Sequence, residues 1–393
     1  VSAAILLVPT FLMGGTLPVL SRYLARRRGV VGSAVGILYG LNTLGAAAGA
    51  FLSGFVFIRL WGTQATIHLA VGINMALAAA FVGLHSLAGG GEASAEEAAE
   101  EPPADAVLGR VRLGLLLLAV GISGFVSFSY EVVWTRLLAL VFETTVHAFS
   151  VMLTTFLLGL GLGGAVAGAL VRRGTKRGYW RLYGYLEALI GLCGLATIPL
   201  FLPPPLGYSS FAQLTMVQFV RSAMVMIVPT TLMGAAFPIA CHLYAAGVRQ
   251  TGESVGRIYV ANTVGAVLGA LLTGFWLVRM LGSQGSIVFG SLLMVASGAL
   301  VLAVAPRPER RRALLASLVP ALILVAVALG LWGLIPGDAI LRHQVRCHAV
   351  GYGDPDLPLE VLGYDEGVEG SVIALRHPDG TKLLSVGTTI VAG

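Results

Sequence analysis

Long apolar runs separated by short polar connections dominate the chain. A run of about 20 apolar residues is long enough to cross the hydrocarbon core of a bilayer as a helix. Ten runs of that kind occur, and each predicts a membrane-spanning helix. They cover residues 1–21, 35–58, 65–87, 113–141, 147–171, 183–203, 219–244, 256–278, 286–305 and 313–335.

The composition agrees with this pattern. Of the 393 residues, 56% are hydrophobic and 11% are charged, whereas an ordinary soluble domain has roughly 25% charged residues. These values exclude a soluble enzyme, a disordered chain and a disulfide-rich secreted domain. The sequence therefore predicts an all-α polytopic membrane protein, with the lipid bilayer as its principal partner.

Arginine supplies nearly all of the positive charge behind the net charge of +6. The arginines cluster in every second connection, as in the segments 26–28, 172–173 and 310–312. Cytoplasmic loops of membrane proteins are enriched in such residues, so one orientation places all clusters in the cytoplasm. No basic face with interleaved aromatic residues occurs outside these loops, so a nucleic-acid partner is not expected.

Three segments interrupt or follow the helical pattern. Residues 88–112 are rich in Gly, Ala, Glu and Pro and predict an acidic flexible linker. Residues 306–335 contain an arginine cluster and one additional transmembrane helix. Residues 336–393 have an aqueous composition and predict the start of a small β domain. In this segment, two short strands are joined by a turn at 377–380, where a proline and a glycine occur.

The sequence repeats itself at a constant offset of 220 residues. Matching positions are mostly glycines and polar residues. They include Gly36, Tyr39, Asn42, Thr43, Gly45 and Gly49 in the first copy and Gly256, Tyr259, Asn262, Thr263, Gly265 and Gly269 in the second. Agreement of this extent without a gap indicates two related units.

The second unit is complete, with six helices over 113–305, whereas residues 1–87 contain the last three helices of the first. Two six-helix units in parallel orientation, joined by a cytoplasmic linker, are the plan of the major facilitator transporters. The sequence therefore predicts a major-facilitator-like pseudo-repeat. About one hundred further residues, with three helices, are expected before Val1.

Glycines spaced four residues apart predict the faces on which these helices pack closely. The pairs are Gly45/Gly49, Gly265/Gly269, Gly159/Gly163 and Gly164/Gly168.

Two acidic residues lie within predicted helices, where charge is costly. Glu131 is about midway along its helix, and Glu187 is near the cytoplasmic start of another. One hypothesis places both in a proton or cationic-substrate site, because a polyamine suits two buried carboxylates. The other hypothesis gives both residues a structural role, as an ion pair or a hydrogen bond that fixes helix packing. For Glu131 the structural partner is Arg136, five residues later and offset by about 140° around the helix.

Asn42 and Asn262 occupy equivalent positions of the two units, each within Tyr-x-x-Asn-Thr. A helix-wall asparagine bonds a neighbouring helix backbone or contacts substrate, so both are candidate substrate-binding residues. The cysteines form no C-x-x-C pair, and no metal site and no catalytic residue is indicated.

Several segments match a known family. The segments are SGFVSFSYEVVWTRLLAL, TFLLGLGLGG, YLEALIGL, VPTTLMGAAFPIA and VGRIYVANTVGAVLGALLTGF, followed in the tail by Tyr364-x-Glu366-Gly367 and SVIALRHPDGTKLLSV. Together they resemble the fused major-facilitator/spermidine-synthase family of bacterial membrane proteins. The tail looks like the β-hairpin entry to a spermidine-synthase-like domain. On this resemblance the chain is a piece truncated at both ends.

The resemblance implies a protein of the bacterial inner membrane that binds, makes or moves polyamine-like molecules. It also implies an aminopropyltransferase that uses decarboxylated S-adenosylmethionine in a nucleotide-binding fold. These residues contain no such fold, so the fragment itself holds no cofactor and its enzymatic activity stays open. The alternative is a catalytically silent accessory subunit that packs in a larger membrane complex.

The charge pattern predicts that residues 336–393 lie outside the cytoplasm, because helix 313–335 follows a cytoplasmic arginine cluster. A cysteine introduced within 336–360 should react with a membrane-impermeant thiol reagent in intact cells. A cysteine introduced within 175–178 should not react. The reverse labelling pattern contradicts this orientation.

Overall fold

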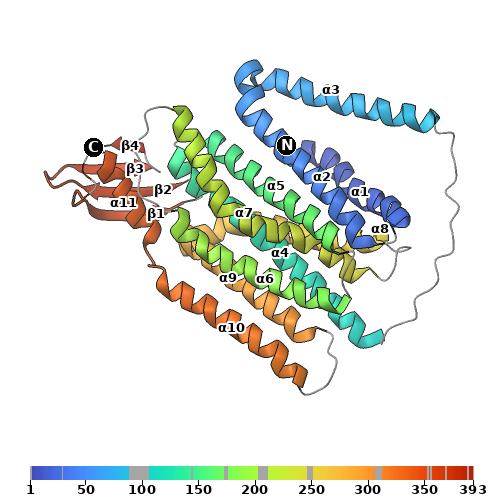
Figure 1. Cartoon of the computed structure of the whole chain (residues 1–393). Coiled ribbons are helices and arrows are strands. Elements are labelled where there is room, and N and C mark those ends of the chain that lie inside the picture. The colour runs from blue at the N-terminus through green and yellow to red at the C-terminus, as the bar shows by residue number, and fades with distance from the viewer. Residues whose placement is uncertain are drawn as a thin grey trace.

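In a computed structural model of the chain, the described residues form a bundle of ten long helices, with a short helix and a small sheet at one end (Figure 1). The structure describes residues 2–28, 30–87, 106–142, 145–171, 176–201, 211–245, 251–305, 312–351, 354, 356–367, 370–386 and 389–392. Most of the predicted linker at 88–112, and many of the clustered arginines, lie outside these ranges.

Each predicted apolar run overlaps a helix of the bundle. The helices are α1 (Ser2–Arg28), α2 (Val31–Leu52), α3 (Ile58–Leu87), α4 (Ala106–Phe142), α5 (Thr145–Leu170), α6 (Lys176–Phe201), α7 (Phe211–Tyr244), α8 (Thr251–Leu272), α9 (Val278–Val304) and α10 (Arg312–Leu334).

Two pairs of helices, α2 with α3 and α8 with α9, are joined by a π-helix and a glycine turn. The π-helices are η1 (Ser53–Phe57) and η3 (Thr273–Leu277), and the turns contain Gly62 and Gly282. The glycines have φ of 76° and 71°, a left-handed backbone that residues with a side chain rarely adopt. Glycine therefore lets the chain change direction at both points.

The helices from α4 to α9 form the centre of the bundle. α8 lies along α4, and α9 lies along both α6 and α4. α5 packs against α2 and α7. α10 covers α9, and α1 contacts α2 and α8. α3 extends away from the bundle, and its main contact is with η1 (Figure 1). The apolar side chains of α3 are consequently exposed.

Glycines bring the backbones of α4 and α8 into direct contact. A Cβ atom on Gly265 would overlap the backbone of Gly121, and one on Gly269 would overlap that of Phe125. Two helices can approach this closely only where their facing residues lack side chains. The contact confirms the close packing predicted for Gly265 and Gly269.

The predicted glycine pairs of α5 also pack closely, on two different neighbours. A Cβ atom on Gly163 would overlap Thr231 of α7, and one on Gly168 would lie 3.0 Å from Gly36 of α2. α5 is therefore held between these two helices by small residues on two of its faces.

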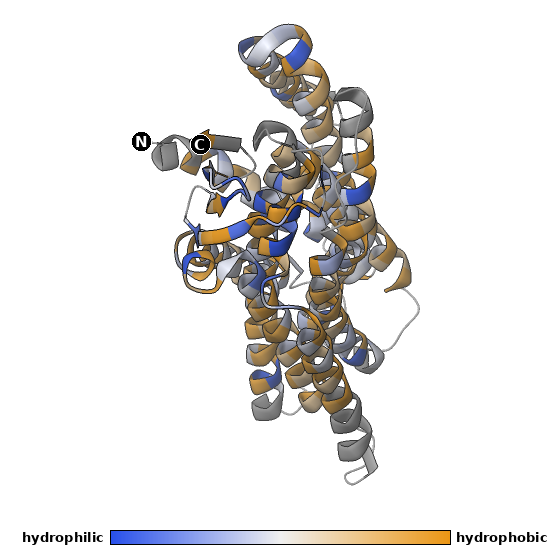
Figure 2. Ribbon diagram, turned by 90° about the vertical axis from the view of Figure 1, so that its left-hand side faces the viewer, coloured by the Kyte–Doolittle hydropathy of each residue, from blue (hydrophilic) through white to orange (hydrophobic). Residues whose placement is uncertain are grey.

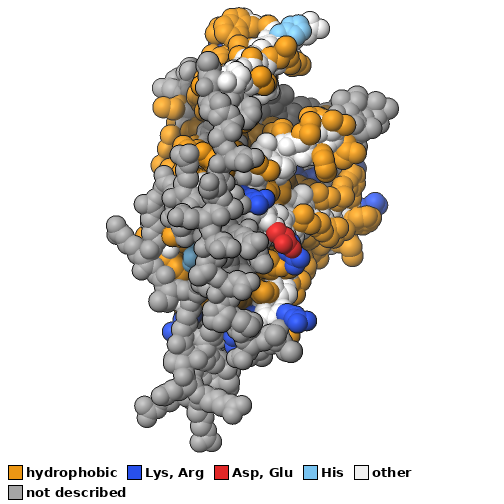
Figure 3. Space-filling view, turned by 90° about the vertical axis from the view of Figure 1, so that its right-hand side faces the viewer, with side chains coloured by type: hydrophobic (Ala, Val, Ile, Leu, Met, Phe, Trp, Pro, Cys, Tyr) orange, Lys and Arg blue, Asp and Glu red, His pale blue; other side chains and the backbone are white. Residues whose placement is uncertain are grey.

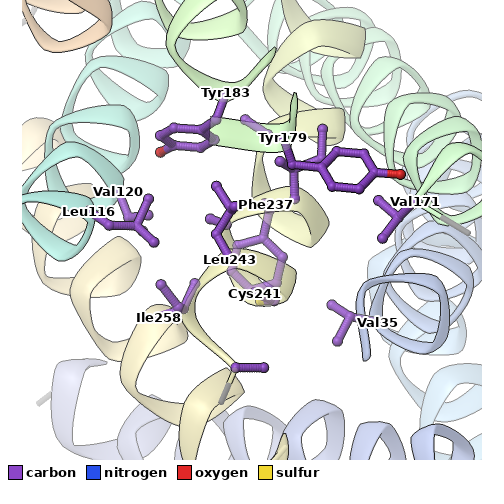
Figure 4. Close-up of a cluster of buried hydrophobic side chains, with 14 of the residues drawn as sticks. Val35, Leu116, Val120, Val171, Tyr179, Tyr183, Phe237, Cys241, Leu243 and Ile258 are labelled. Atoms are coloured by element: carbon purple, nitrogen blue, oxygen red, sulfur yellow. The ribbon is translucent and has the colours of Figure 1, made fainter. Parts of the chain in front are cut away.

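Apolar side chains fill the spaces between the helices. In one buried cluster, side chains such as Val35, Leu116, Tyr183, Phe237 and Ile258 converge from α2, α4, α6, α7 and α8 (Figure 4). A second cluster surrounds Tyr130 and Trp134 of α4. α4 contributes side chains to both clusters.

Seven helical stretches among the described residues are long and apolar enough to cross a membrane. Two of them, Val31–Leu84 and Thr251–Val304, are 54 residues long. Each of these long stretches contains two of the predicted runs, joined through a π-helix. Hydrophobic residues predominate along the bundle, and hydrophilic residues gather where the sheet lies (Figure 2).

The tail forms α11 (Ala339–Gly351) and a four-stranded antiparallel sheet. The strands are β1 (Glu360–Glu366), β2 (Ser371–Arg376), β3 (Lys382–Val386) and β4 (Thr389–Ala392), in that order. The predicted hairpin is confirmed, because β2 pairs with β3 and Gly380 has φ of 91° in the turn between them. The pattern of the sequence does not predict α11, β1 or β4, since short elements in a polar tail leave a weak signal.

Gly265→Ala should lower the melting temperature of the detergent-solubilised protein, whereas Gly45→Ala, at the equivalent position of the first unit, should not. The first Cβ atom overlaps the α4 backbone, and such overpacking costs about 1–3 kcal/mol. A Cβ atom on Gly45 meets no atom of the described residues within 4 Å, and alanine favours a helix over glycine by about 1 kcal/mol. Equal melting temperatures would argue against the backbone contact of α4 with α8.

Candidate functional site

A cavity of about 90 Å³ lies inside the bundle where α2 meets the helices from α4 to α8. One water needs about 10–15 Å³ by the same measure, so several waters or one slender molecule fit. The polar side chains that line the cavity come from four helices. They are Tyr39, Ser123, Ser127, Tyr183 and Asn262.

An aromatic wall borders the cavity on the side of α7. The ring of Phe237 stacks on that of Tyr39 with centroids 5.0 Å apart, and it meets Tyr259 edge-on at 6.2 Å. The hydroxyl of Tyr39 lies near the side chain of Thr43, one turn later in α2. Aromatic faces attract cations, so this wall suits a positively charged ligand.

Glu187 is fully buried immediately behind this cavity. The hydroxyl of Ser297 donates to its Oε2 at 3.1 Å, and the hydroxyls of Tyr183 and Ser123 lie beside the carboxylate. Its Oε1 has no hydrogen bond of normal geometry within the described part of the chain. No ion pair to Glu187 occurs among the described residues either.

The ion pair expected between Glu131 and Arg136 does not form within the described residues. Arg136 instead contacts the segment that contains the sheet. Its Nη2 donates to the carbonyl of Gly367 at 2.7 Å, and its guanidinium lies near Glu366. The physical reason is angular, because an offset of about 140° puts the two side chains on different faces of α4. The half-buried Glu131 remains a candidate ligand-binding residue.

The two equivalent asparagines lie in different surroundings. Asn262 lines the cavity, and its backbone carbonyl contacts α4 at Gly124. Asn42 is exposed on α2, on a face that no described helix covers. The structure therefore brings Asn262 together with the neighbours of Glu187 and leaves Asn42 outside this site.

The carboxylate of Glu366, at the end of β1, fixes the sheet to the bundle. Its Oε2 accepts hydrogen bonds from the backbone N–H of Ser283, at 2.9 Å, and from the Ser283 hydroxyl. Its Oε1 accepts one from the hydroxyl of Tyr364 at 2.8 Å. Ser283 follows Gly282, where α9 resumes its helical path, so the carboxylate caps a helix N-terminus.

The protonation of Tyr364 supports this contact. Burial and the adjacent Glu366 carboxylate raise the pKa of Tyr364 well above its ordinary value, so the phenol keeps its proton and donates it. Gln284 adds a second link, because its Nε2 donates to the carbonyl of Pro336 at 2.6 Å. Sequence reasoning missed these roles, since Ser283 and Gln284 follow a repeated glycine without any chemical motif.

The comparisons with known proteins give one distant relative. No family model matches the chain. Over 269 residues, the chain is 26% identical to polyamine aminopropyltransferase 1 of Streptomyces coelicolor. The match covers 67% of this chain and 47% of that protein, so the chain spans about half the length of the curated relative it matches.

Glu366→Gln and Ser283→Ala should each loosen the sheet from the bundle. A hydrogen bond to a charged group contributes about 1.5–3 kcal/mol, so amide hydrogen exchange in β1 and β2 should rise about tenfold or more. Thr63→Ala, at the exposed position equivalent to Ser283, is the matched control. Unchanged exchange in both variants would show that other contacts hold the sheet.

Proposed function

We propose that this chain belongs to a multi-pass membrane protein with a polyamine-related function, and that its central cavity binds a protonated amine at Glu187. The proposal depends on a fully buried carboxylate behind a cavity, without an ion pair among the described residues. The distant similarity to a polyamine aminopropyltransferase supports the class of ligand.

The chemistry of the site favours an ammonium group. A carboxylate without a counter-charge is costly inside an apolar bundle. A primary ammonium group supplies that charge together with three N–H donors. In the proposed complex these donors suit the Glu187 carboxylate and the hydroxyl oxygens of Ser123 and Tyr183, both of which line the cavity. The aromatic wall adds cation–π attraction for the same charge.

We further infer that the bundle lies in a bacterial inner membrane, with the arginine-bearing connections in the cytoplasm and the sheet outside. The seven apolar stretches support the insertion. α10 runs from the end where α4 begins to the end that holds the sheet (Figure 1). The end away from the sheet presents Lys and Arg side chains, in agreement with a cytoplasmic face (Figure 3).

The proposed architecture is a major-facilitator-like pair of related units. The two units share the same departures from regular α-helix. The π-helices η1 and η3 lie 220 residues apart, and so do the left-handed glycines Gly62 and Gly282. A π-helix followed five residues later by a left-handed glycine is an uncommon combination. Its recurrence at the spacing of the sequence repeat favours a common fold for the two segments.

Aminopropyl transfer is not assigned to the described residues. An adenosyl donor is commonly held where a parallel strand leads through a glycine-rich loop into a helix. The described sheet is an antiparallel meander in which each strand leads directly to the next, so decarboxylated S-adenosylmethionine does not fit it. The role proposed for these residues is to bind and position the amine.

The exposed surface of α3 favours a second candidate function, a silent accessory subunit in a larger membrane complex. Trp61, Met75 and Phe81 are among its exposed apolar side chains, and Phe81 is 73% exposed. An apolar surface of this extent fits another protein or lipid. A measurement of amine binding distinguishes the amine-binding protein from the accessory subunit.

Glu187→Gln should weaken binding of radiolabelled spermidine to the purified chain in lipid nanodiscs by about ten- to hundredfold. The substitution keeps the shape of the side chain and removes its charge, and such a bond contributes about 1.5–3 kcal/mol. Glu253→Gln is the control, because Glu253 is exposed and pairs with Arg257 at 2.6 Å. Wild-type protein that binds no amine would instead favour the accessory subunit.

A further inference from the structure

Basic side chains of α7 and α11 meet at the end of the bundle that holds the sheet. Arg221 belongs to α7, and His343 and Arg346 belong to α11. Both guanidinium groups are close enough to His343 to act electrostatically on its ring, and Arg221 acts on the Cys347 thiol as well. Two helices that are far apart in the sequence therefore bring two guanidinium groups to one histidine ring.

These three basic groups have no acidic partner in the described ranges. The ion pairs of the described residues include neither Arg221, His343 nor Arg346. Arg342, also on α11, differs in this respect, because it is paired with Asp338 at 2.8 Å. Like charges repel one another at close range, so a bound anion would stabilise the cluster.

The charges of the cluster favour an anion over a metal ion. Sγ of Cys347 lies 3.5 Å from Nε2 of His343, and thiol and imidazole groups are ligands of transition metals. Arg221 and Arg346 would repel a metal ion at this point, because a guanidinium keeps its positive charge in proteins. Asp356 lines a groove together with Arg346 but makes no ion pair with it in the described structure. The site therefore suits an anion with several acceptor oxygens.

The cluster lies where the apolar surface of the bundle begins. Arg221 is the third residue of the apolar stretch Phe219–Tyr244, and the exposed side chains of Met224 and Val228 continue along the same helix. α10 exposes Trp332 close to its end, a few residues before α11 begins. Aromatic and basic residues at the ends of apolar helices are typical of the level at which lipid headgroups lie.

We propose that Arg221, His343 and Arg346 bind the phosphate group of an anionic phospholipid. Each guanidinium offers a planar set of donors that matches two phosphate oxygens. The acyl chains of the lipid would extend along the exposed apolar side chains of α7, which a free phosphate ion would leave uncovered. The site is separate from the cavity, so this inference goes beyond amine binding and does not depend on it.

A lipid bound in this way would connect the tail to the bundle. α11 packs on the sheet, where Leu341 and Val345 contact the buried Ile373. α7 lines the cavity farther along its length, through Met233 and Phe237. A phosphate between the two helices supplies the negative charge that their basic groups lack. Binding should therefore raise the melting temperature of the protein.

A comparison of two lipids tests the site on the whole chain in a neutral detergent. The protein is titrated with short-chain phosphatidylglycerol, which is anionic, or with phosphatidylcholine of the same chain length, and bound lipid is counted by native mass spectrometry. Phosphatidylglycerol should bind at least tenfold more tightly and should raise the melting temperature. Inorganic phosphate at an equal concentration should not displace it.

Variants assign the binding to these side chains. Arg221→Gln and Arg346→Gln should each weaken binding of phosphatidylglycerol about tenfold and leave phosphatidylcholine unchanged. Arg221→Lys keeps the charge and should keep most of the affinity. Arg279→Gln is the matched control, because Arg279 is exposed at the same end of the bundle and outside the cluster. A melting curve for each variant verifies the fold. If Arg221→Gln does not fold, the exposed Arg346 decides.

Three results would overturn the inference. Equal binding of the two lipids would remove the anionic preference. Loss of affinity in Arg279→Gln equal to that in Arg346→Gln would show general attraction to positive charge. Displacement of the lipid by an equal concentration of inorganic phosphate would assign the site to free phosphate. Each result leaves amine binding at Glu187 untouched, because that proposal concerns a different part of the bundle.

Discussion

The backbone contact between α4 and α8 is the constraint on which the rest of the structure depends. Gly265 and Gly269 allow α8 to lie directly on α4 at Gly121 and Phe125. Side chains of ordinary size at these positions would force the helices apart. Because α4 is fixed in this way, its next face turns toward α5, α6 and α7 and closes one side of the cavity. Asn262, on the same stretch of α8, then becomes part of the cavity wall.

Burial of Glu187 gives the cavity its chemical character. Hydroxyl groups surround this carboxylate, with Ser297 as a donor at 3.1 Å, and no ion pair to it occurs in the described parts of the chain. Hydroxyls stabilise a carboxylate less than a cation does, so the proposed ligand is positively charged. The stacked rings of Tyr39 and Phe237 add aromatic surface to the cavity wall. A cationic ligand meets both requirements at once.

The tail influences this site without touching the cavity. It holds Arg136 at the Gly367 carbonyl and Glu366 at Ser283, so α4 and α9 are both linked to the sheet. Arg136 makes this contact from a face of α4 that Glu131 does not share. In this arrangement the sheet is a structural support for the bundle.

The sequence by itself determined the apolar helices and the hairpin of β2 and β3, because the length of an apolar run and the residues of a turn are local properties. It could not determine the surroundings of equivalent residues. Asn262 lines a cavity while Asn42 is exposed, and Gly265 touches a backbone while Gly45 meets no atom within 4 Å in the described part of the chain. Repetition fixes the identity of a residue, whereas its contacts depend on which helix lies next to it. The choice of Gly367 over Glu131 as the partner of Arg136 joins positions 231 residues apart. Only tertiary structure decides such a contact, because it depends on the angle at which a side chain leaves its helix and on which distant segment the fold brings to that face.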